Sequence, residues 1–164
     1  MAETLRLFYA LWPDAATRAA LARLQAPLAG RRMHEQDLHI TLAFLGQQPA
    51  SLIPALQEIL RQAPPSAMEL TLDRIGYFPR SRIVWAGMRR VPTSLVALHD
   101  DLALMLAELD VRSVQHGTFT PHVTLARDAP APDENPLQPV HWHADRIVLV
   151  QSISGPDAQR YRVL

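Results

Sequence analysis

The sequence predicts a mixed α and β domain made of two similar halves. Its 164 residues, 48% of them hydrophobic, suffice for one globular domain with a substantial core, spanning residues 1–164. Segments with strand periodicity alternate with amphipathic helical segments in the order β-α-β-α-β-β-α-β-β-β. In addition, the sequence HITLA at residues 39–43 recurs as HVTLA at residues 122–126. We expect this repeat to mark two halves that face each other.

The first half is expected to contain two strands and two helices. Residues 4–12 have a strand pattern, and Asp14 is placed to cap a helix that runs to about Pro27. Residues 38–45 alternate as a strand that Gly46 ends, and Ser51 then caps a second helix. The apolar stripe of that helix consists of Leu52, Ile53, Leu56, Ile59 and Leu60.

The second half is expected to contain one helix and the remaining strands. Four prolines between residues 128 and 139 predict an irregular surface loop there. The expected elements are, in order, strands at residues 68–75 and 83–88, a helix from about Thr93, and strands at residues 121–127, 144–152 and 160–164.

The repeated motif combines an apolar side with a reactive side. Side chains alternate between the two faces of a strand, so His39 and Thr41 share one face, as do His122 and Thr124. Two imidazoles from separate strands suit a reaction in which one group takes a proton and another gives one near neutral pH. The two copies therefore predict a two-histidine catalytic site.

Composition excludes several other classes of site. Sixteen basic and sixteen acidic residues give a formal charge of zero, so the overall charge of a non-specific nucleic-acid binder is missing. The chain has no Cys, which excludes thiolate zinc sites and cysteine nucleophiles, and every basic residue is Arg, which excludes a phosphate-loop lysine. No segment has the length and hydropathy of a membrane span or an export signal. A cytoplasmic protein is expected.

Metal and serine-hydrolase sites are disfavoured by the spacing of their candidate residues. The spacing of His141 and His143 would place both rings on one face if these residues formed a strand, but no third ligand lies at an informative distance. His34 and His39 are five residues apart rather than the four that a zinc-protease helix needs, and no serine has the glycine frame of a nucleophile elbow. We expect neither a metal nor a cofactor.

Three further residues are candidates for contacts with a substrate. Arg127 follows the second motif and is suited to stabilise an anion, although strict alternation turns it away from the histidine face unless the strand bends. Phe119 and Tyr161 are aromatic residues close to strand ends. Arg80 and Arg82 flank a predicted turn, where they are able to contact a polynucleotide backbone.

The pair of His-x-Thr-x motifs resembles the motifs that define the 2H phosphoesterases. Within that superfamily the surrounding sequence is similar to the RNA 2′,3′-cyclic phosphodiesterases, also called 2′-5′ RNA ligases. A departure from the family pattern is Arg32-Met33, where an aromatic-aliphatic pair is expected. The supporting stretches are residues 6–13, 38–46, 78–79 ahead of Trp85, 119–127 and Tyr161, which together span nearly the whole chain.

This resemblance implies a bilobed α+β fold, in which two antiparallel sheets with approximate twofold symmetry surround a central cleft and the helices pack outside. It also implies metal-independent hydrolysis of a ribose 2′,3′-cyclic phosphate to a 2′-phosphate. His39 is then the proton donor to the O3′ leaving group and His122 the acceptor from water. Thr41 and Thr124 would bond the non-bridging oxygens, and Arg127 would stabilise the added charge.

The expected partners are RNA ends or nucleoside 2′,3′-cyclic phosphates, bound by a monomer without a membrane attachment. Two alternatives remain open. In the first, the chain is a protein that binds RNA ends without catalysing a reaction. In the second, it is a phosphodiesterase for another cyclic phosphate, such as ADP-ribose 1″,2″-cyclic phosphate.

Overall fold

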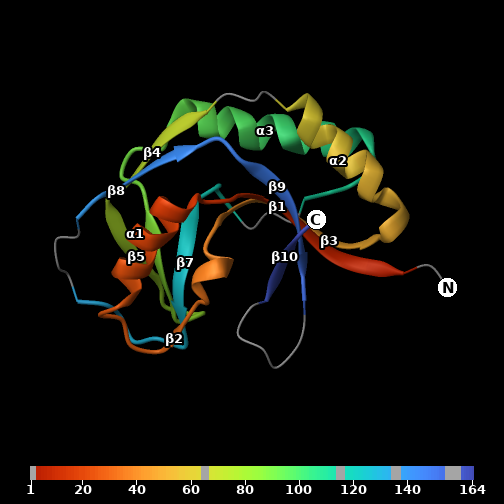
Figure 1. Ribbon diagram of the computed structural model, residues 1–164. Coiled ribbons are helices and arrows are strands. Elements are labelled where there is room, and N and C mark those ends of the chain that lie inside the picture. Colours follow the sequence, from red (N-terminus) through yellow and green to blue (C-terminus); the bar gives the residue numbers. More distant parts are fainter. Residues whose placement is uncertain (1–2, 64–66, 114–116, 134–137, 154–159) are drawn as a thin grey trace.

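The chain folds into strands and helices in a computed structural model that describes residues 3–63, 67–113, 117–133, 138–153 and 160–164 (Figure 1). No helix in these residues is both long and apolar enough to span a bilayer. The α-helices are α1 (Ala15–Gln25), α2 (Ile53–Gln62) and α3 (Thr93–Glu108), and two short 3-10 helices are η1 (Glu35–Asp37) and η2 (Ala50–Leu52). The strands are β1 (Thr4–Leu11), β2 (Arg31–Arg32), β3 (Ile40–Pro49), β4 (Met68–Leu72), β5 (Arg74–Phe78), β6 (Ile83–Gly87), β7 (His122–Arg127), β8 (Val140–Ala144), β9 (Ile147–Ser152) and β10 (Tyr161–Val163).

The strands form antiparallel sheets in which the two motif strands are neighbours. The larger sheet has the order β10-β9-β1-β3-β7-β6-β5, with β2 paired to β7, and β4 and β8 form a separate pair. A single residue pair, Ile40 with Val123, joins β3 to β7. The C-terminal strands β9 and β10 lie on the β3 side of this junction, so each half draws on distant parts of the chain. The predicted α+β class is confirmed.

The predicted apolar stripe of α2 packs into the main hydrophobic core, and α3 contributes to the same core. Figure 1 shows α2 and α3 together on one side of the molecule, with α1 apart from them. Four leucines of α3, namely Leu95, Leu98, Leu102 and Leu106, belong to the main hydrophobic core. Asp14 caps α1 as predicted, because its side chain accepts a hydrogen bond from the Thr17 backbone N–H at 2.7 Å.

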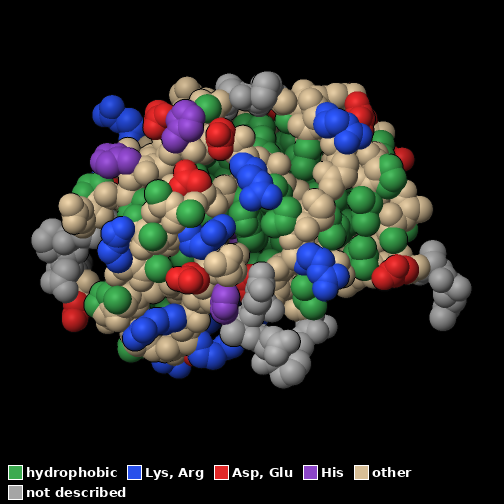
Figure 2. Space-filling model, viewed as in Figure 1, with side chains coloured by type: hydrophobic (Ala, Val, Ile, Leu, Met, Phe, Trp, Pro, Cys, Tyr) green, Lys and Arg blue, Asp and Glu red, His purple; other side chains and the backbone are tan. Residues whose placement is uncertain are grey.

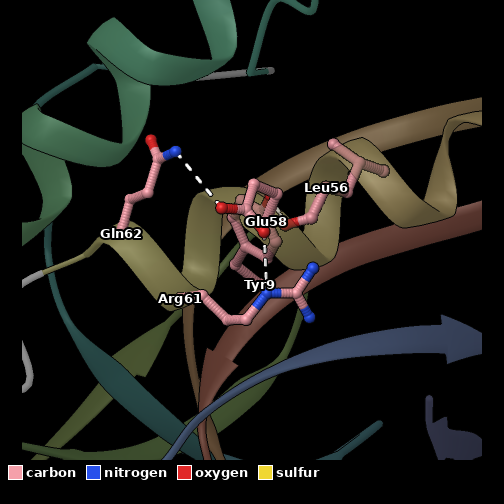
Figure 3. Close-up of polar contacts among 5 residues, drawn as sticks. All are labelled: Tyr9, Leu56, Glu58, Arg61 and Gln62. Carbon is pink, nitrogen blue, oxygen red and sulfur yellow. Dashed lines mark hydrogen bonds and ion pairs between the residues drawn. The ribbon is translucent and has the colours of Figure 1, made fainter.

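A buried tyrosine fixes α2 to the sheet (Figure 3). The Tyr9 hydroxyl, on β1, donates to the Leu56 carbonyl of α2 at 2.8 Å, and burial raises the pKa of Tyr9. On the exposed side of the helix, Glu58 accepts from Arg61 at 2.7 Å and from Gln62 at 3.4 Å. Because Glu58, Arg61 and Gln62 all belong to α2, these contacts do not join the helix to the sheet, and its apolar stripe and the Tyr9 contact attach it.

Several element boundaries differ from the expected ones. β3 does not end at Gly46 but continues to Pro49, because Gly46 adopts a φ of +68° at an irregularity in the pairing with β1. Ser51 lies inside η2 and does not cap α2.

The segment 68–75 is not one strand either. It is divided at Asp73, with β4 in the small sheet and β5 in the large one. Residues 140–144 form β8, which was not among the expected strands. The predicted loop at residues 128–139 contains no helix or strand in its described part, and residues 134–137 lie outside the described residues.

Two strand glycines leave room for Trp85 on β6. A Cβ atom built on Gly76 of β5 would lie 2.0 Å from the Trp85 ring, and one built on Gly87 would lie 2.5 Å from it. Gly76 is paired directly with Trp85, and the indole ring occupies the space into which the side chain of a larger residue at position 76 would project. These glycines fix the position of a side chain that contacts the second motif.

Gly76→Ala is therefore expected to destabilise the fold by roughly 1–3 kcal/mol and to displace Trp85. Urea unfolding measures the first effect, and near-ultraviolet circular dichroism measures the second. The double variant Gly76→Ala, Trp85→Phe should recover part of the loss, because phenylalanine lacks the indole atoms that the added methyl group meets. Equal losses in the single and double variants would contradict this explanation.

Candidate active site

The polar sides of both motifs share one face of the sheet. Ile40 and Val123 lie opposite each other where β3 meets β7, and both side chains are fully buried in the main core. Directly opposed residues in an antiparallel pair point to the same face, and their chain neighbours point to the other. His39 and His122, which immediately precede these two residues, therefore lie together on the opposite face with the motif threonines.

A β-bulge brings Arg127 onto that same face. Trp85 pairs with Thr124, whereas the preceding residue of β6 pairs with Ala126, so Leu125 is an extra residue in β7. Leu125 and Ala126 are consequently both buried, and the alternation resumes one residue out of phase. The bulge is the bend that Arg127 needed in order to lie on the histidine side.

The first motif strand has a matching bulge. Two consecutive residues of β1 pair with Thr41 and Ala43, which leaves Leu42 as the extra residue. Phe44 then occupies the place in β3 that Arg127 occupies in β7, and its side chain is 55% exposed. Phe44 was not among the residues predicted from the sequence, although its position directly after the repeated HITLA marks it as the counterpart of Arg127.

A buried glutamine supports the bulge in β7. Gln25, at the end of α1, donates from Nε2 to the Leu125 carbonyl at 3.0 Å and to the Met33 carbonyl at 2.9 Å. The Met33 backbone N–H donates to the same Leu125 carbonyl at 2.9 Å. A bulge interrupts the regular hydrogen bonds of the sheet, and here α1 and the segment after β2 supply the missing donors.

His39 lies among aromatic side chains of its own half. Its ring is stacked on Trp12 with 5.5 Å between centroids, and Phe8 and Tyr161 lie at 5.0 and 5.1 Å. Its Nδ1 is 2.6 Å from the Asp37 carbonyl, which only accepts, so Nδ1 carries a proton. Nε2 is then the functional nitrogen, 3.0 Å from the Thr41 hydroxyl.

Asp37 holds two parts of this environment at once. Its carbonyl orients His39, while its buried carboxylate accepts hydrogen bonds from the backbone N–H groups of Arg160 at 2.7 Å and Tyr161 at 3.3 Å. Burial raises the pKa of Asp37, against the opposing effect of these two donors. The contact places the start of β10, and with it the Tyr161 ring, against His39.

His122 has a similar but smaller enclosure in the other half. Its Nδ1 is 2.7 Å from the Thr120 carbonyl, so this nitrogen also carries a proton and Nε2 is left as the functional atom. Phe78 at the end of β5 contacts the ring edge-on at 5.2 Å, and Trp85 lies at 5.8 Å. Both histidines are thus held in the same tautomer by a backbone carbonyl two residues before them.

The electrostatics of the site favour neutral imidazoles and an anion between them. Burial lowers the pKa of His39 from 6.5 to about 4, with further lowering from His122 and Arg127 against the effect of the Asp37 carbonyl. Burial and Arg127 also lower the pKa of His122. Arg127 Nε is buried and has no hydrogen-bond partner among the described residues. A buried guanidinium nitrogen without a partner, near two imidazoles, matches an anionic ligand.

Comparison with known proteins places the chain in a family. The 2′-5′ RNA ligase superfamily matches residues 12–156, which include both motifs and Arg127. The chain belongs to the 2′-5′ RNA ligase superfamily. The chain is similar to the RNA 2′,3′-cyclic phosphodiesterase of Escherichia coli, with 39% identity over 136 residues, 79% of this chain and 75% of that protein. The enzyme of that name from Thermus thermophilus is 34% identical over 98% of this chain and 88% of its own length.

Solved structures share the fold along nearly the whole chain. The crystal structure of E. coli LigT with NADP+ has a TM-score of 0.86 and 32% sequence identity, covering 99% of this chain and 96% of that one. A structure of TT0787 from T. thermophilus has a TM-score of 0.81 at 30% identity. The resemblance to the 2H phosphoesterases is therefore confirmed.

Only some of the predicted site residues lie beside the two histidines. Thr124 is on the histidine face and pairs with Trp85, and the Tyr161 ring contacts His39. Phe119 instead stacks on His99 of α3, with ring centroids 4.0 Å apart, and packs against the main core. Phe119 therefore joins a helix to the segment before His122, and a substrate contact by it stays a prediction.

The histidines considered as metal ligands lie on an exposed face of the small sheet. His141 and His143 are exposed on β8, and the His143 Nδ1 is paired with Glu69 of β4. Among the described residues no group of three or more His, Asp or Glu side chains is placed to hold a metal ion.

Proposed function

We propose that this protein is an RNA 2′,3′-cyclic phosphodiesterase that uses His39 and His122 as its acid and base. The observation that carries the proposal is the position of Arg127 on the histidine face, where its charge lowers the pKa of both imidazoles and its buried Nε has no partner in the described part of the chain. The names of the relatives from E. coli and T. thermophilus support the substrate class. A superfamily structure that holds 3′-AMP supports a nucleotide ligand.

In this mechanism His122 is the general base. Its Nδ1–H is held by the Thr120 carbonyl, and its lowered pKa keeps Nε2 unprotonated near neutral pH. The oxygen of a water molecule attacks phosphorus while Nε2 accepts the proton of that water. In-line displacement places the leaving oxygen on the side of phosphorus opposite the attacking water. The acid that protonates this oxygen therefore has to come from the other motif strand.

His39 is the general acid that protonates the leaving O3′ as the P–O3′ bond breaks. A bound phosphate anion raises its pKa, which favours a proton on Nε2 in the complex. Once Nε2 carries that proton, the Thr41 hydroxyl no longer donates to it and is able to donate to a non-bridging oxygen. The product is a 2′-phosphate with a free 3′-hydroxyl, and proton exchange with solvent restores both histidines.

Arg127 and Thr124 complete the proposed phosphate site. The transition state carries more negative charge on the non-bridging oxygens than the cyclic diester does, and a fixed guanidinium stabilises that increase. A ribose 5′-hydroxyl in place of water would be activated by the same base and would form a 2′-5′ bond. Because water is in large excess, hydrolysis is the expected direction.

The function is tested by incubating the purified protein with a nucleoside 2′,3′-cyclic phosphate in EDTA and identifying the product by phosphorus NMR. A 2′-phosphomonoester formed at an undiminished rate in EDTA is expected. A 3′-phosphomonoester would contradict the assignment of O3′ as the leaving group. Binding without turnover would favour the RNA-end-binding protein, and turnover of ADP-ribose 1″,2″-cyclic phosphate alone would favour the other cyclic substrate.

The pKa shifts also predict the pH dependence. The active form has His39 protonated and His122 neutral, so kcat/KM falls on the alkaline side as His39 loses its proton and on the acid side as His122 gains one. Because both pKa values lie below 6.5 in the free protein, the maximum of kcat/KM should lie on the acid side of pH 6.5. The kcat profile should lie at higher pH, since bound phosphate raises the pKa of His39. A kcat/KM that keeps rising above about pH 8 would contradict this assignment.

A further inference from the structure

The direction in which Arg127 points depends on one irregularity in β7. If the strict alternation of a strand continued through the second motif, Arg127 would stand on the core side of the sheet with Val123. The extra residue at Leu125 shifts the alternation by one place, so Arg127 lies on the side of His122. A group that keeps this bulge in place therefore determines whether the guanidinium faces the two histidines.

One side-chain amide joins the bulge to the segment that follows β2. Gln25 Nε2 donates to the Leu125 carbonyl at 3.0 Å and to the Met33 carbonyl at 2.9 Å, and the Met33 N–H donates to the same Leu125 carbonyl. A primary amide carries two N–H groups on one nitrogen, and both are used here. The amide thus ties the two backbone segments to each other at the residue that interrupts the alternation.

The basic side chains of β2 make other contacts. Arg31 pairs with Asp128 at 2.7 Å, and Arg32 Nε donates to the Leu28 carbonyl at 3.3 Å. Figure 2 shows basic side chains exposed at the place where Figure 1 labels β2, whereas the Gln25 side chain lies beneath the surface, with 5% of the residue exposed. Because water does not compete for its hydrogen bonds, the buried amide holds the carbonyls more firmly than an exposed side chain would.

A close backbone contact fixes β2 on the other side of the bulge. Arg31 is paired with Arg127, and Gly30 has a φ of +87°. A Cβ atom built on Gly30 would lie 2.7 Å from the Arg127 carbonyl. The β2 backbone therefore lies directly against this part of β7, and Gln25, the last residue of α1, connects the helix to both strands. The position of the end of α1 is in this way linked to the direction of the Arg127 side chain.

We propose that Gln25 is a positioning residue of the active site: its amide holds the β7 bulge, and the bulge directs Arg127 to the phosphate between the two histidines. This inference rests on the proposed function, in which Arg127 stabilises the charge of the transition state. Gln25 acts only through Arg127. Its removal should therefore weaken the same step as the removal of Arg127, although no group that contacts the substrate is changed.

The first test replaces the amide by a side chain of similar length that has no donor. Gln25→Met should lower kcat for a 2′,3′-cyclic nucleotide by about 10–10²-fold, because a displacement of about 1 Å at a catalytic group has costs of this order. The value of kcat/KM should fall by a similar factor, as expected when an interaction of the transition state is lost.

Tyr9→Phe is the matched control. It also removes one buried donor to a backbone carbonyl, that of Leu56, but on the core side of the sheet. Thermal unfolding compares the loss of stability in the two variants, and only Gln25→Met should lose activity. An equal loss of kcat in both variants, or none in Gln25→Met, would overturn the proposal.

A double variant tests whether Gln25 acts through Arg127. If it does, adding Gln25→Met to Arg127→Ala should leave kcat at the value of Arg127→Ala alone, because the side chain that the bulge directs is already absent. A loss in the double variant equal to the product of the two single losses would overturn the proposal, since Gln25 would then act on another part of the site.

A titration without substrate keeps this test separate from the proposed function. Burial lowers the pKa of His39 and of His122, and the charge of Arg127 lowers both further. Gln25→Met should therefore raise the pKa of both imidazoles toward the values found in Arg127→Ala, followed by NMR of the imidazole C–H signals. Tyr9→Phe should change neither value.

The two proposals fail in different ways. If the wild-type protein hydrolyses no 2′,3′-cyclic phosphate, the proposed function fails, and the role of Gln25 is still judged by the histidine titrations. If the wild-type protein is active and both histidines of Gln25→Met titrate as in the wild type, the positioning role of Gln25 is overturned and the proposed function stands.

Discussion

Replacing either His39 or His122 with alanine is expected to lower kcat for a 2′,3′-cyclic nucleotide by about 10²–10⁴-fold, because each variant removes one of the two proton transfers. The fold should persist, since each ring lies at the surface of the sheet opposite the main core and contacts mainly aromatic side chains of its own half. Discontinuous assays of mononucleotide hydrolysis measure the loss of kcat, and thermal unfolding shows whether the fold persists. His141→Ala, an exposed histidine on β8, is the matched control.

The double variant sharpens this prediction. The effects of replacing two groups that act in one step are not additive. Replacing both histidines should therefore lower kcat by a much smaller factor than the product of the two single effects. The pH profile also separates them: loss of His122 should remove the fall in kcat/KM on the acid side, and loss of His39 the fall on the alkaline side. Wild-type turnover in either single variant would remove the two-histidine mechanism.

Arg127→Ala is expected to lower kcat by about 10²–10³-fold, the usual cost of losing a donor that stabilises transition-state charge. Arg127→Lys should recover only part of the rate, because an ammonium lacks the two-pronged geometry of the guanidinium. Arg112→Ala, an exposed arginine after α3, is the control of equal charge.

The same variant has a second readout that a structural role would not give. Arg127 lowers the pKa of both histidines, so its removal should raise the pKa of each, measured by NMR titration of the imidazole C–H signals. Unchanged histidine titrations together with an unchanged rate would show that the side chain does not act on the site.

The main features of the fold were predictable because they depend on local patterns. Alternating residues identified β1, β3 and β7, and a 3.6-residue stripe identified α2. The boundary errors came from tertiary effects. β4 and β5 read as one strand because both have strand patterns, and only the separation of two sheets divides them at Asp73.

The candidate site was predictable to the extent that it was repeated. Two copies of a short motif named the histidines and threonines, and the resemblance added Arg127. Phe44, Trp12 and Gln25 were missed, because a single aromatic or amide residue has no signal in one sequence that separates a site wall or a bulge support from ordinary packing.

The sequence by itself determined the chemical groups and the face of each strand on which they stand, since side-chain alternation is a property of the strand alone. Only the tertiary structure decided how those faces are combined. The pairing of Ile40 with Val123 brings the two motifs together, and the bulge at Leu125 turns Arg127 toward them. Burial then lowers the pKa of both imidazoles, which depends on the low polarity of neighbours that come from distant parts of the chain.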